Sequence, residues 1–383
     1  MDASMSAVYG ELYQLLAQKA DAYAQAVEDQ CAVWEGRIPA HQPLLLHSPP
    51  PKAPSVPQFT TREIHFDKEK MLLAGMSGMV SSLAGGMQAV PSIRANMGCG
   101  IFPSLFPGIL PMLFDDQRMP WIIEHLDKET IKKLRPEDIT LTDEFKLGLE
   151  HMAYQAEQLE GTGAYVFPLD LQDAVDIAHL VYGDPFFYDL YDDPEFIHHL
   201  LDLSCRAIEV GIPECLKVMP HSDTVITHYN ELAMPRSLGG IKFSEDTSTL
   251  ICPDHIDEFT LPSLKRLLEF TGGGYVHFCG YNEQLLDKFL NMDLVHGMNF
   301  GNPEKYDMEQ VLRKFAQAGK VFYGSIPKKA DEDYQQYFTR LTAAATDAQG
   351  RCWLLLSMGA ALEEAEKIRA AWKAVTRNGA NEQ

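Results

Sequence analysis

The chain has 383 residues, of which 46% are hydrophobic, and carries a formal net charge of −22 at pH 7. This length suits one large α/β domain or two ordinary ones, and the composition is ordinary for a soluble enzyme. The negative charge argues against nucleic acids and anionic membrane surfaces as partners, because both would repel the chain. No apolar run approaches the roughly 20 residues of a membrane span.

The first elements in chain order are helical. Apolar residues recur at helical spacing from Tyr9 to Trp34, which predicts a helix. The stretch from Pro39 to Pro57 contains seven prolines and is interpreted as an extended linker or arm. Asp67 is a helix N-cap candidate and predicts a second helix. We therefore expect an N-terminal helix and arm over residues 1–60 and a main domain over residues 61–383.

From residue 87 onward, short apolar segments alternate with amphipathic ones. This alternation predicts a parallel β-sheet covered by helices. The number of repeats favours an α/β fold of the closed (β/α)8, or TIM, barrel type over an open sheet. No GxGxxG follows a predicted strand, so a dinucleotide-binding fingerprint is missing. The predicted strands are 87–94, 164–169, 223–229, 275–279, 294–300, 320–326 and 352–358.

The segment YVHFCG, residues 275–280, places an imidazole and a thiol two residues apart at the end of a predicted strand. Alternate residues of a strand point to the same face, so His277 and Cys279 project together. In a barrel of this kind, chemistry sits at the carboxyl ends of the strands. Two interpretations stay open: the pair belongs to a metal site, or it lines a pocket.

Polar residues also follow other predicted strands, and we expect some of them to contact substrate. Arg94 is suited to clamping a carboxylate or phosphate, or else it pairs with an acidic residue of a neighbouring loop. Asn299 and Asn302 either bind a ligand or cap a turn. The full set of expected substrate-binding residues is Arg94, Asn96, His228, Asn230, Asn299, Asn302 and Met358.

Three longer segments have the order and spacing of a known group of enzymes. They are LQDAVDIAHLVYGDPFFYDLYDDPEFIHHLLDL (171–203), GGIKFSEDTSTLICPDHIDEFTLPSLKRL (239–267) and VHFCG followed by LVHGMNFGNPEKYDMEQV (294–311). Together with PSIRANMGCGIFPSLF (91–106), they resemble the uroporphyrinogen decarboxylase superfamily, and within it the cobamide-dependent methyltransferases. The resemblance implies a TIM barrel, zinc as cofactor, and methyl transfer between a small methylated compound or thiol and a corrinoid.

The methyltransferase branch holds zinc through a His-x-Cys strand and a later cysteine, so the resemblance implies His277 and Cys279 as ligands. Zinc prefers thiolate and imidazole ligands and lowers the pKa of a bound thiol. This chain has Ser357-Met358-Gly359 where the family has its late cysteine. Cys352 starts that predicted strand, about 20 Å from its other end.

Three interpretations stay open: a third ligand comes from elsewhere, the metal is held weakly, or no metal binds. As a third ligand, Asp246 is preferred, because it directly follows a short apolar segment and carboxylates bind zinc. The other candidates are Glu245, Cys252 and Cys99. Asp246, Glu245 and Tyr281 are also the residues that we expect to act in catalysis.

A metal-free decarboxylase or lyase, or a ligand-binding barrel acting on a small carboxylated molecule, is the alternative that the missing cysteine favours. The arginine-rich RQAGR motif of porphyrinogen decarboxylases does not occur in residues 1–90, which argues against a porphyrinogen substrate. No Asp-x-His-x-x-Gly motif occurs, so a corrinoid would arrive on a partner protein.

Seven scattered cysteines and the lack of a basic-then-apolar N-terminus predict a cytoplasmic protein. Whether the chain is a monomer or a homodimer stays open.

Overall fold

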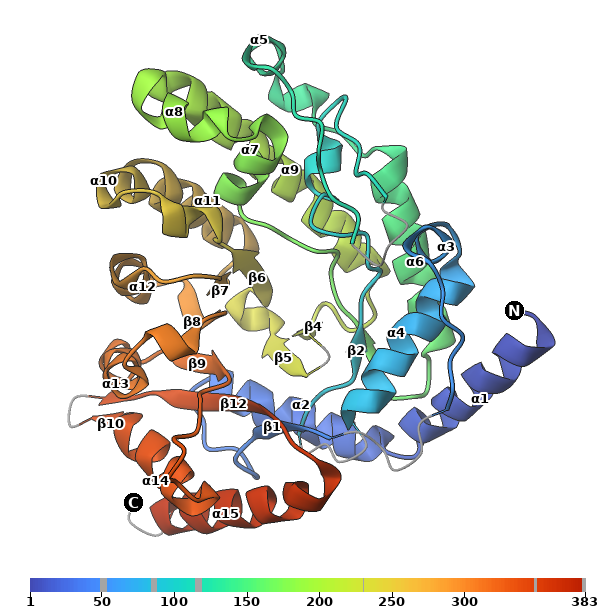
Figure 1. Ribbon diagram of the computed structural model, residues 1–383, viewed down its shortest axis with the longest axis vertical. Helices are drawn as coiled ribbons and strands as arrows, with labels where there is room; N and C mark the ends of the chain where they lie inside the picture. The colour runs from blue at the N-terminus through green and yellow to red at the C-terminus, as the bar shows by residue number, and fades with distance from the viewer. Residues whose placement is uncertain (49–53, 84–87, 114–118, 230, 348–349, 381–383) are drawn as a thin grey trace.

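The computed structural model describes residues 1–383 except 49–53, 84–87, 114–118, 230, 348–349 and 381–383. Its main sheet has six parallel strands in the order β1–β12–β9–β8–β7–β6. Figure 1 shows this sheet curving around the centre of the molecule with helices outside it. The strands are β1 Leu44–His47, β6 Ile241–Ser244, β7 Gly274–Phe278, β8 Val295–Phe300, β9 Val321–Gly324 and β12 Trp353–Gly359.

A second parallel pair faces the main sheet. β2 (Ser92–Ile93) pairs with β3 (Tyr165–Val166), and Figure 1 places β2 across the centre from β8 and β9. The chain after β3 reaches β6 through one backbone hydrogen bond, from Asp173 N–H to the Ser244 carbonyl at 2.9 Å. The architecture is therefore mixed α/β and TIM-like. Among the described residues, the strand ladders do not close into the complete barrel that the sequence predicts.

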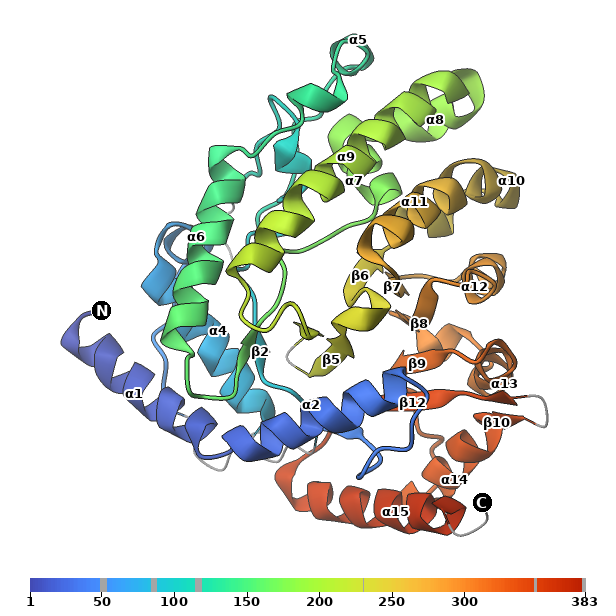
Figure 2. The same ribbon diagram turned by 180° about the vertical axis from the view of Figure 1, so that it is seen from behind.

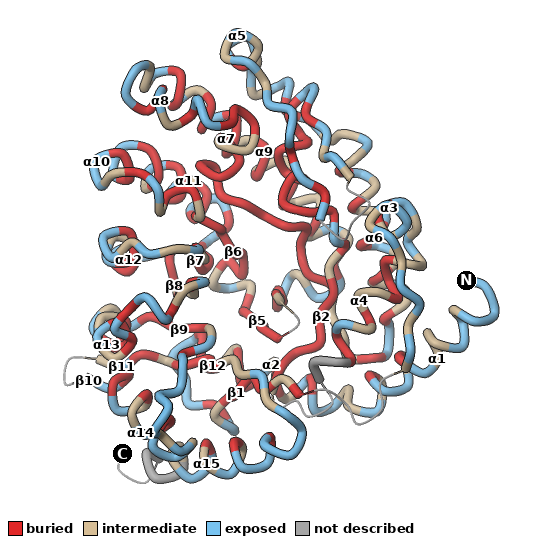
Figure 3. The backbone as a smooth tube through the Cα atoms, in the orientation of Figure 1, coloured by how far each residue is buried: buried red, intermediate tan, exposed pale blue. Residues whose placement is uncertain are grey.

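The side chains of the main sheet alternate between two cores, as strand geometry requires. Leu45, Tyr275 and Leu355 belong to an inner core with Trp34. Their sequence neighbours, such as Val276, pack outward against the helices. Figure 3 shows the strands largely buried around the centre, while the outer helices combine buried stretches with exposed ones.

The helices cover the outside of the sheet and close one of its ends. Within the described residues, none combines the length and apolarity needed to cross a bilayer. Up to residue 218 they are α1 Ala3–Ala17, α2 Ala20–Trp34, α3 Thr61–Phe66, α4 Lys68–Leu83, α5 Lys128–Ile131, α6 Asp143–Gln158, α7 Ala174–Tyr182, α8 Pro185–Asp192 and α9 Pro194–Val218. The remaining helices are α10 Pro253–His255, α11 Leu261–Thr271, α12 Glu283–Leu290, α13 Met308–Ala318, α14 Tyr334–Ala344 and α15 Leu362–Ala380.

One predicted strand belongs to a hairpin and not to the main sheet. β4 (Val225–His228) lies within the predicted barrel strand 223–229. It pairs antiparallel with β5 (Leu232–Pro235), which follows that segment. The Gln30 side chain from α2 holds this hairpin, accepting from Ala233 N–H at 2.7 Å and donating to the Glu231 carbonyl at 2.8 Å. Figure 2 shows α2 across the end of the sheet, beside β5.

The N-terminal region also differs from the prediction. The predicted arm contains β1, which pairs with β12, so the sheet begins before the predicted boundary at residue 60. The apolar run of Leu44, Leu45 and Leu46 is fully buried, and this burial outweighs the flanking prolines. The predicted first helix is two helices, α1 and α2. Asp67 does begin the next long helix, accepting from the Glu69 and Lys70 N–H groups.

Candidate metal centre

Three ligand-type side chains meet at the carboxyl ends of β6 and β7. Asp246 follows β6, while His277 and Cys279 lie at the end of β7, and their ligand atoms all lie within 4.8 Å of one another. Cys279 Sγ is 3.5 Å from His277 Nε2, and that nitrogen is 4.0 Å from Asp246 Oδ1. Strand pairing creates this cluster, because Ser244 is in register with His277.

These separations fit a tetrahedral zinc ion. A Zn–S bond of about 2.3 Å and a Zn–N bond of about 2.0 Å at a tetrahedral angle place sulfur and nitrogen roughly 3.5 Å apart. The sulfur–nitrogen pair already has this spacing. The carboxylate oxygen, 4.0 Å from the imidazole nitrogen, would need to move about 0.7 Å closer to it. His277 and Asp246 are half-buried and Cys279 is exposed, so three protein ligands would leave a fourth position open toward solvent.

Neighbouring residues hold each of the three ligands. Asn299 on β8 has its side-chain oxygen 2.7 Å from His277 Nδ1, which turns Nε2 toward the cluster. Asp246 Oδ1 accepts the Cys279 N–H at 2.5 Å. The buried Asp176 carboxylate accepts the N–H groups of Asp246 and Thr247 at 3.0 and 2.6 Å, so the loop after β6 is fixed in place.

The loop after β8 supports the thiol from the other side. Asn302 accepts the Gly280 N–H at 2.9 Å, a bond between the loops after β8 and β7, and its side chain makes no cap hydrogen bond to the turn that follows it. Gly301 lies so close to Cys279 that an added Cβ would be 2.7 Å from Sγ. Any larger residue at position 301 would therefore displace the sulfur.

Without a metal, the electrostatics of the cluster keep the His277 imidazole and the Cys279 thiol neutral. Burial and the nearby Lys242 ammonium lower the pKa of His277, so the imidazole is a free-base ligand at neutral pH. Burial and the Asp246 carboxylate raise the pKa of the Cys279 thiol. A bound divalent cation reverses the second effect, because it deprotonates a coordinating thiol.

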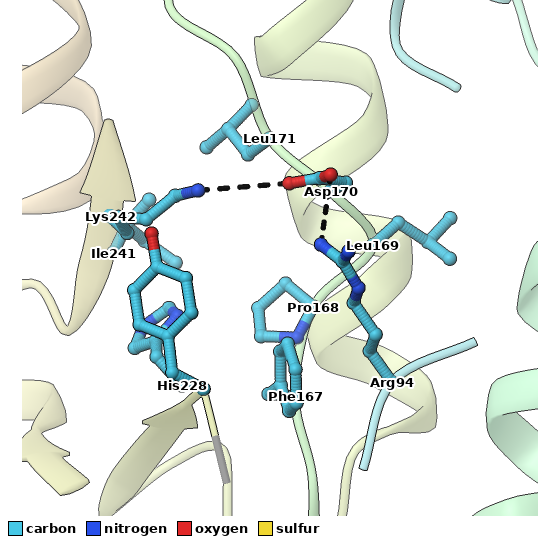
Figure 4. A pocket seen from close by; sticks show the side chains of 10 residues that line it. Arg94, Phe167, Pro168, Leu169, Asp170, Leu171, His228, Ile241 and Lys242 are labelled. Carbon is cyan, nitrogen blue, oxygen red and sulfur yellow. Dashed lines mark ion pairs between the residues drawn. The ribbon is translucent and has the colours of Figure 1, made fainter. Parts of the chain in front are cut away.

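Next to the cluster, three charged side chains border a small pocket (Figure 4). Asp170, just after β3, lies between Arg94 at 2.8 Å and Lys242 at 3.7 Å. Although burial opposes it, these two cations hold the pKa of Asp170 below its usual range. Arg94 is thus paired with an acidic residue, one of the two roles expected for it. The cavity offers about 20 Å³ to the centre of a water-sized sphere, room for a water molecule.

His228 lines the same pocket from the hairpin. It is buried, and its Nε2 lies 2.8 Å from the Gly240 carbonyl oxygen. Burial lowers its pKa to about 3, so it is a neutral donor to that carbonyl.

The other predicted site residues lie apart from the cluster. Glu245 is fully buried behind Asp246 and accepts a hydrogen bond from Ser248 at 2.6 Å. Tyr281 is exposed and donates to Glu283. Met358 packs against the outer core, on the face of β12 opposite to Ser357. Asn96 is exposed, and Asn230 is outside the described residues.

The alternative cysteine ligands also lie elsewhere. Cys99 is buried, and burial raises its pKa to about 12. Cys252 has its sulfur 3.9 Å from the Tyr191 hydroxyl. Cys352 is buried at the start of β12, as its position in the predicted strand indicated. Of the candidates for a further ligand, Asp246 is the one that joins His277 and Cys279.

Sequence reasoning missed a second polar cluster, which we call the His47 network: His47, Glu231, Tyr323 and Ser357. His47 Nε2 forms a hydrogen bond with one oxygen of the Glu231 carboxylate, and the Tyr323 hydroxyl donates to the other. Ser357 donates to the same carboxylate at 2.8 Å. His47 lies in the predicted arm and Glu231 follows a predicted barrel strand, so no motif joins them.

No protein-family model matches the chain, and no curated protein matches it. Among solved structures, a methyltransferase from Methanosarcina mazei is similar, with a TM-score of 0.59 and 12% sequence identity. The similarity covers 91% of this chain and 98% of that one. At this identity, the likeness establishes the fold and leaves activity to be argued from the site.

Proposed function

We propose that the chain is a zinc-dependent methyltransferase that moves a methyl group between a small methylated compound or thiol and a corrinoid carried by a partner protein. The observation that carries this proposal is the Asp246–His277–Cys279 cluster at the carboxyl ends of β6 and β7. A fold shared with a methyltransferase over most of both chains supports it. The proposal includes closure of the fold as a uroporphyrinogen decarboxylase-type barrel and a location in the cytoplasm.

Zinc bound by these three side chains would act as a Lewis acid that activates the sulfur or other heteroatom of the substrate. The protein supplies the remaining requirements. Asn299 keeps His277 Nε2 directed at the site, and Asp176 keeps Asp246 in place. The open side next to Cys279 gives the heteroatom access.

A metal-free lyase or decarboxylase is the second candidate, and one observation favours it. Arg94 and Lys242 flank Asp170 beside the cluster, so the pocket carries an excess of positive charge that suits a carboxylated substrate. That enzyme would not depend on a metal held by His277 and Cys279.

The experiment compares metal-loaded wild-type protein with the His277→Ala variant. Methyl transfer is measured in both directions, from methylcobalamin to a panel of small thiols and from methylated donors to cob(I)alamin. Cys252→Ser serves as the control, because it removes a cysteine outside the cluster. We expect activity in the wild type and the control and none in His277→Ala. Undiminished activity of His277→Ala would contradict the proposal.

A further inference from the structure

We propose that His47, oriented by Glu231, is a proton donor to the heteroatom that loses its methyl group, so that the enzyme demethylates donors whose leaving group would otherwise depart as an anion. This inference rests on the proposed function, and it assigns a catalytic role to the His47 network on the side of the site opposite to the metal cluster. Three features support it: the location of His47, the bonding of its ring nitrogens and its protonation state.

His47 faces the inside of the sheet, as His277 does. It ends β1 two residues after Leu45, which belongs to the inner core, whereas Leu44 and Leu46 pack outward. His277 has the same relation to Tyr275 on β7. Both histidines therefore lie at the carboxyl ends of parallel strands on the concave face, where substrate is handled in folds of this kind.

Aromatic rings of the hairpin tip and β9 connect the two sides. The Tyr229 ring is 6.4 Å from the His277 ring and 6.3 Å from the Tyr323 ring. Tyr323 in turn donates to Glu231, the partner of His47. Tyr229 has φ of +59°, which is uncommon for a residue other than glycine and costs on the order of 1 kcal/mol. Tyr229 therefore keeps an unfavourable backbone conformation at the position where its ring contacts both His277 and Tyr323.

One ring nitrogen of His47, Nε2, is committed to Glu231, and the other, Nδ1, has no hydrogen-bond partner among the described residues. The His47 side chain is 24% exposed, whereas that of Glu231 is 9% exposed. A buried carboxylate that orients a partly exposed imidazole is an arrangement that suits general acid–base catalysis.

The surroundings favour the protonated form of this imidazole. The groups that face it are Glu231 from the hairpin, with Ser357 of β12 and Tyr323 of β9 bonded to the same carboxylate. Burial opposes protonation of His47, but the hydrogen bond and charge of Glu231 outweigh it and raise the pKa of His47. Tyr323 stays neutral, because burial and Glu231 raise its pKa far above the usual value.

In a donor R–X–CH₃, the bond between X and the methyl carbon breaks, and its electron pair stays on X. The methyl group bonds to the reduced corrinoid of the partner, which provides the electron pair for the new bond. The Nδ1 proton of His47 passes to X, so the product leaves as R–XH, and His47 is reprotonated from solvent. A sulfonium or quaternary ammonium donor leaves neutral and needs no such proton, so the network selects for ethers and similar neutral donors.

The test uses aryl methyl ethers that differ in their leaving group, from unsubstituted phenol to nitrophenol, with cob(I)alamin as the methyl acceptor. Zinc-loaded wild type, His47→Gln and His41→Gln are compared. His41→Gln is a matched control, because His41 also pairs with a buried carboxylate, that of Asp29 at 3.1 Å, but on an exposed loop before β1. We expect His47→Gln to lose roughly 10²- to 10⁴-fold in rate with the phenol ether. The loss should shrink toward the nitrophenol ether, which needs no acid, and His41→Gln should match the wild type.

Two further readouts do not depend on activity. The zinc content of His47→Gln should equal that of the wild type. The NMR titration of the His47 ring should show a pKa above that of free histidine, and Glu231→Gln should lower it. A uniform rate loss across the ethers, or no loss, would overturn the proton-donor role. A zinc-loaded wild type that is inert toward every ether would overturn it as well, whereas a wild type unable to hold zinc would overturn the proposed function.

Discussion

The two sides of the site differ in how their polar groups are satisfied. On the β6–β8 side, Asp246, His277 and Cys279 are partly exposed and make few bonds to one another. On the β1–β9–β12 side, the Glu231 carboxylate is buried and accepts from His47, Tyr323 and Ser357. A partly exposed set of ligands suits a cation, whereas a completed hydrogen-bond network suits an oriented imidazole. The difference matches the two roles proposed above, binding the heteroatom on one side and protonating it on the other.

The largest expected effect concerns the hairpin, which supports both sides. Burial lowers the pKa of His228 to about 3, whereas an unfolded histidine titrates near 6.5. Well above pH 6.5, His228 is neutral in both the folded and the unfolded chain. As the pH falls toward 3, His228 becomes protonated in the unfolded chain but stays neutral in the folded one. His228 should therefore cost on the order of 4 kcal/mol of stability over this range. Urea unfolding of wild type and His228→Gln at several pH values measures the difference, and equal pH dependence would contradict it.

The second-largest expected effect is a loss of zinc binding on the β6–β8 side alone. Replacing His277 with alanine removes one of three ligands and should weaken zinc binding by about 3 kcal/mol, or a hundredfold and more. The His47 network would stay intact, because it shares no hydrogen bond with His277. Competition with a chelator gives the affinity, and circular dichroism verifies the fold. Unchanged affinity would show that His277 is not a ligand.

A smaller effect on zinc affinity is expected on the same side when a residue that orients a ligand is replaced. Asn299→Ala keeps every ligand but removes the oxygen that orients His277 Nδ1. Loss of such a partner should lower zinc affinity about 10- to 100-fold. Asn291→Ala, at an exposed helix end, is the control. If both variants bind zinc like the wild type, Asn299 has no positioning role.

The smallest effect is a change in pH dependence on the β1 side. Glu231 raises the pKa of His47, so the acid form is present below that raised value and is lost as pH rises through it. The rate with an ether donor should fall along this limb, and Glu231→Gln should move the limb to lower pH. A pH–rate profile of each protein measures this. If the rate of Glu231→Gln falls over the same pH range as that of the wild type, Glu231 does not set the pKa of the titrating group.

The sequence allowed one side to be predicted and not the other, for a physical reason. His277 and Cys279 share one strand, so their proximity follows from strand geometry alone. Asp246 was found through its position after a short apolar segment, which proved to be β6. His47 and Glu231 are 184 residues apart and meet only because the hairpin folds into the inside of the sheet. Prolines around β1 concealed its strand character, since local propensity does not register the burial of three leucines.

The central claim is that Asp246, His277 and Cys279 hold a metal, and the most direct test is the metal content of anaerobically purified protein. Wild type, Cys279→Ser and Cys252→Ser would be incubated with zinc, desalted and assayed by elemental analysis. The account predicts close to one zinc per chain in the wild type and in Cys252→Ser, and its loss in Cys279→Ser. Wild-type protein that retains no metal after this treatment would contradict the account.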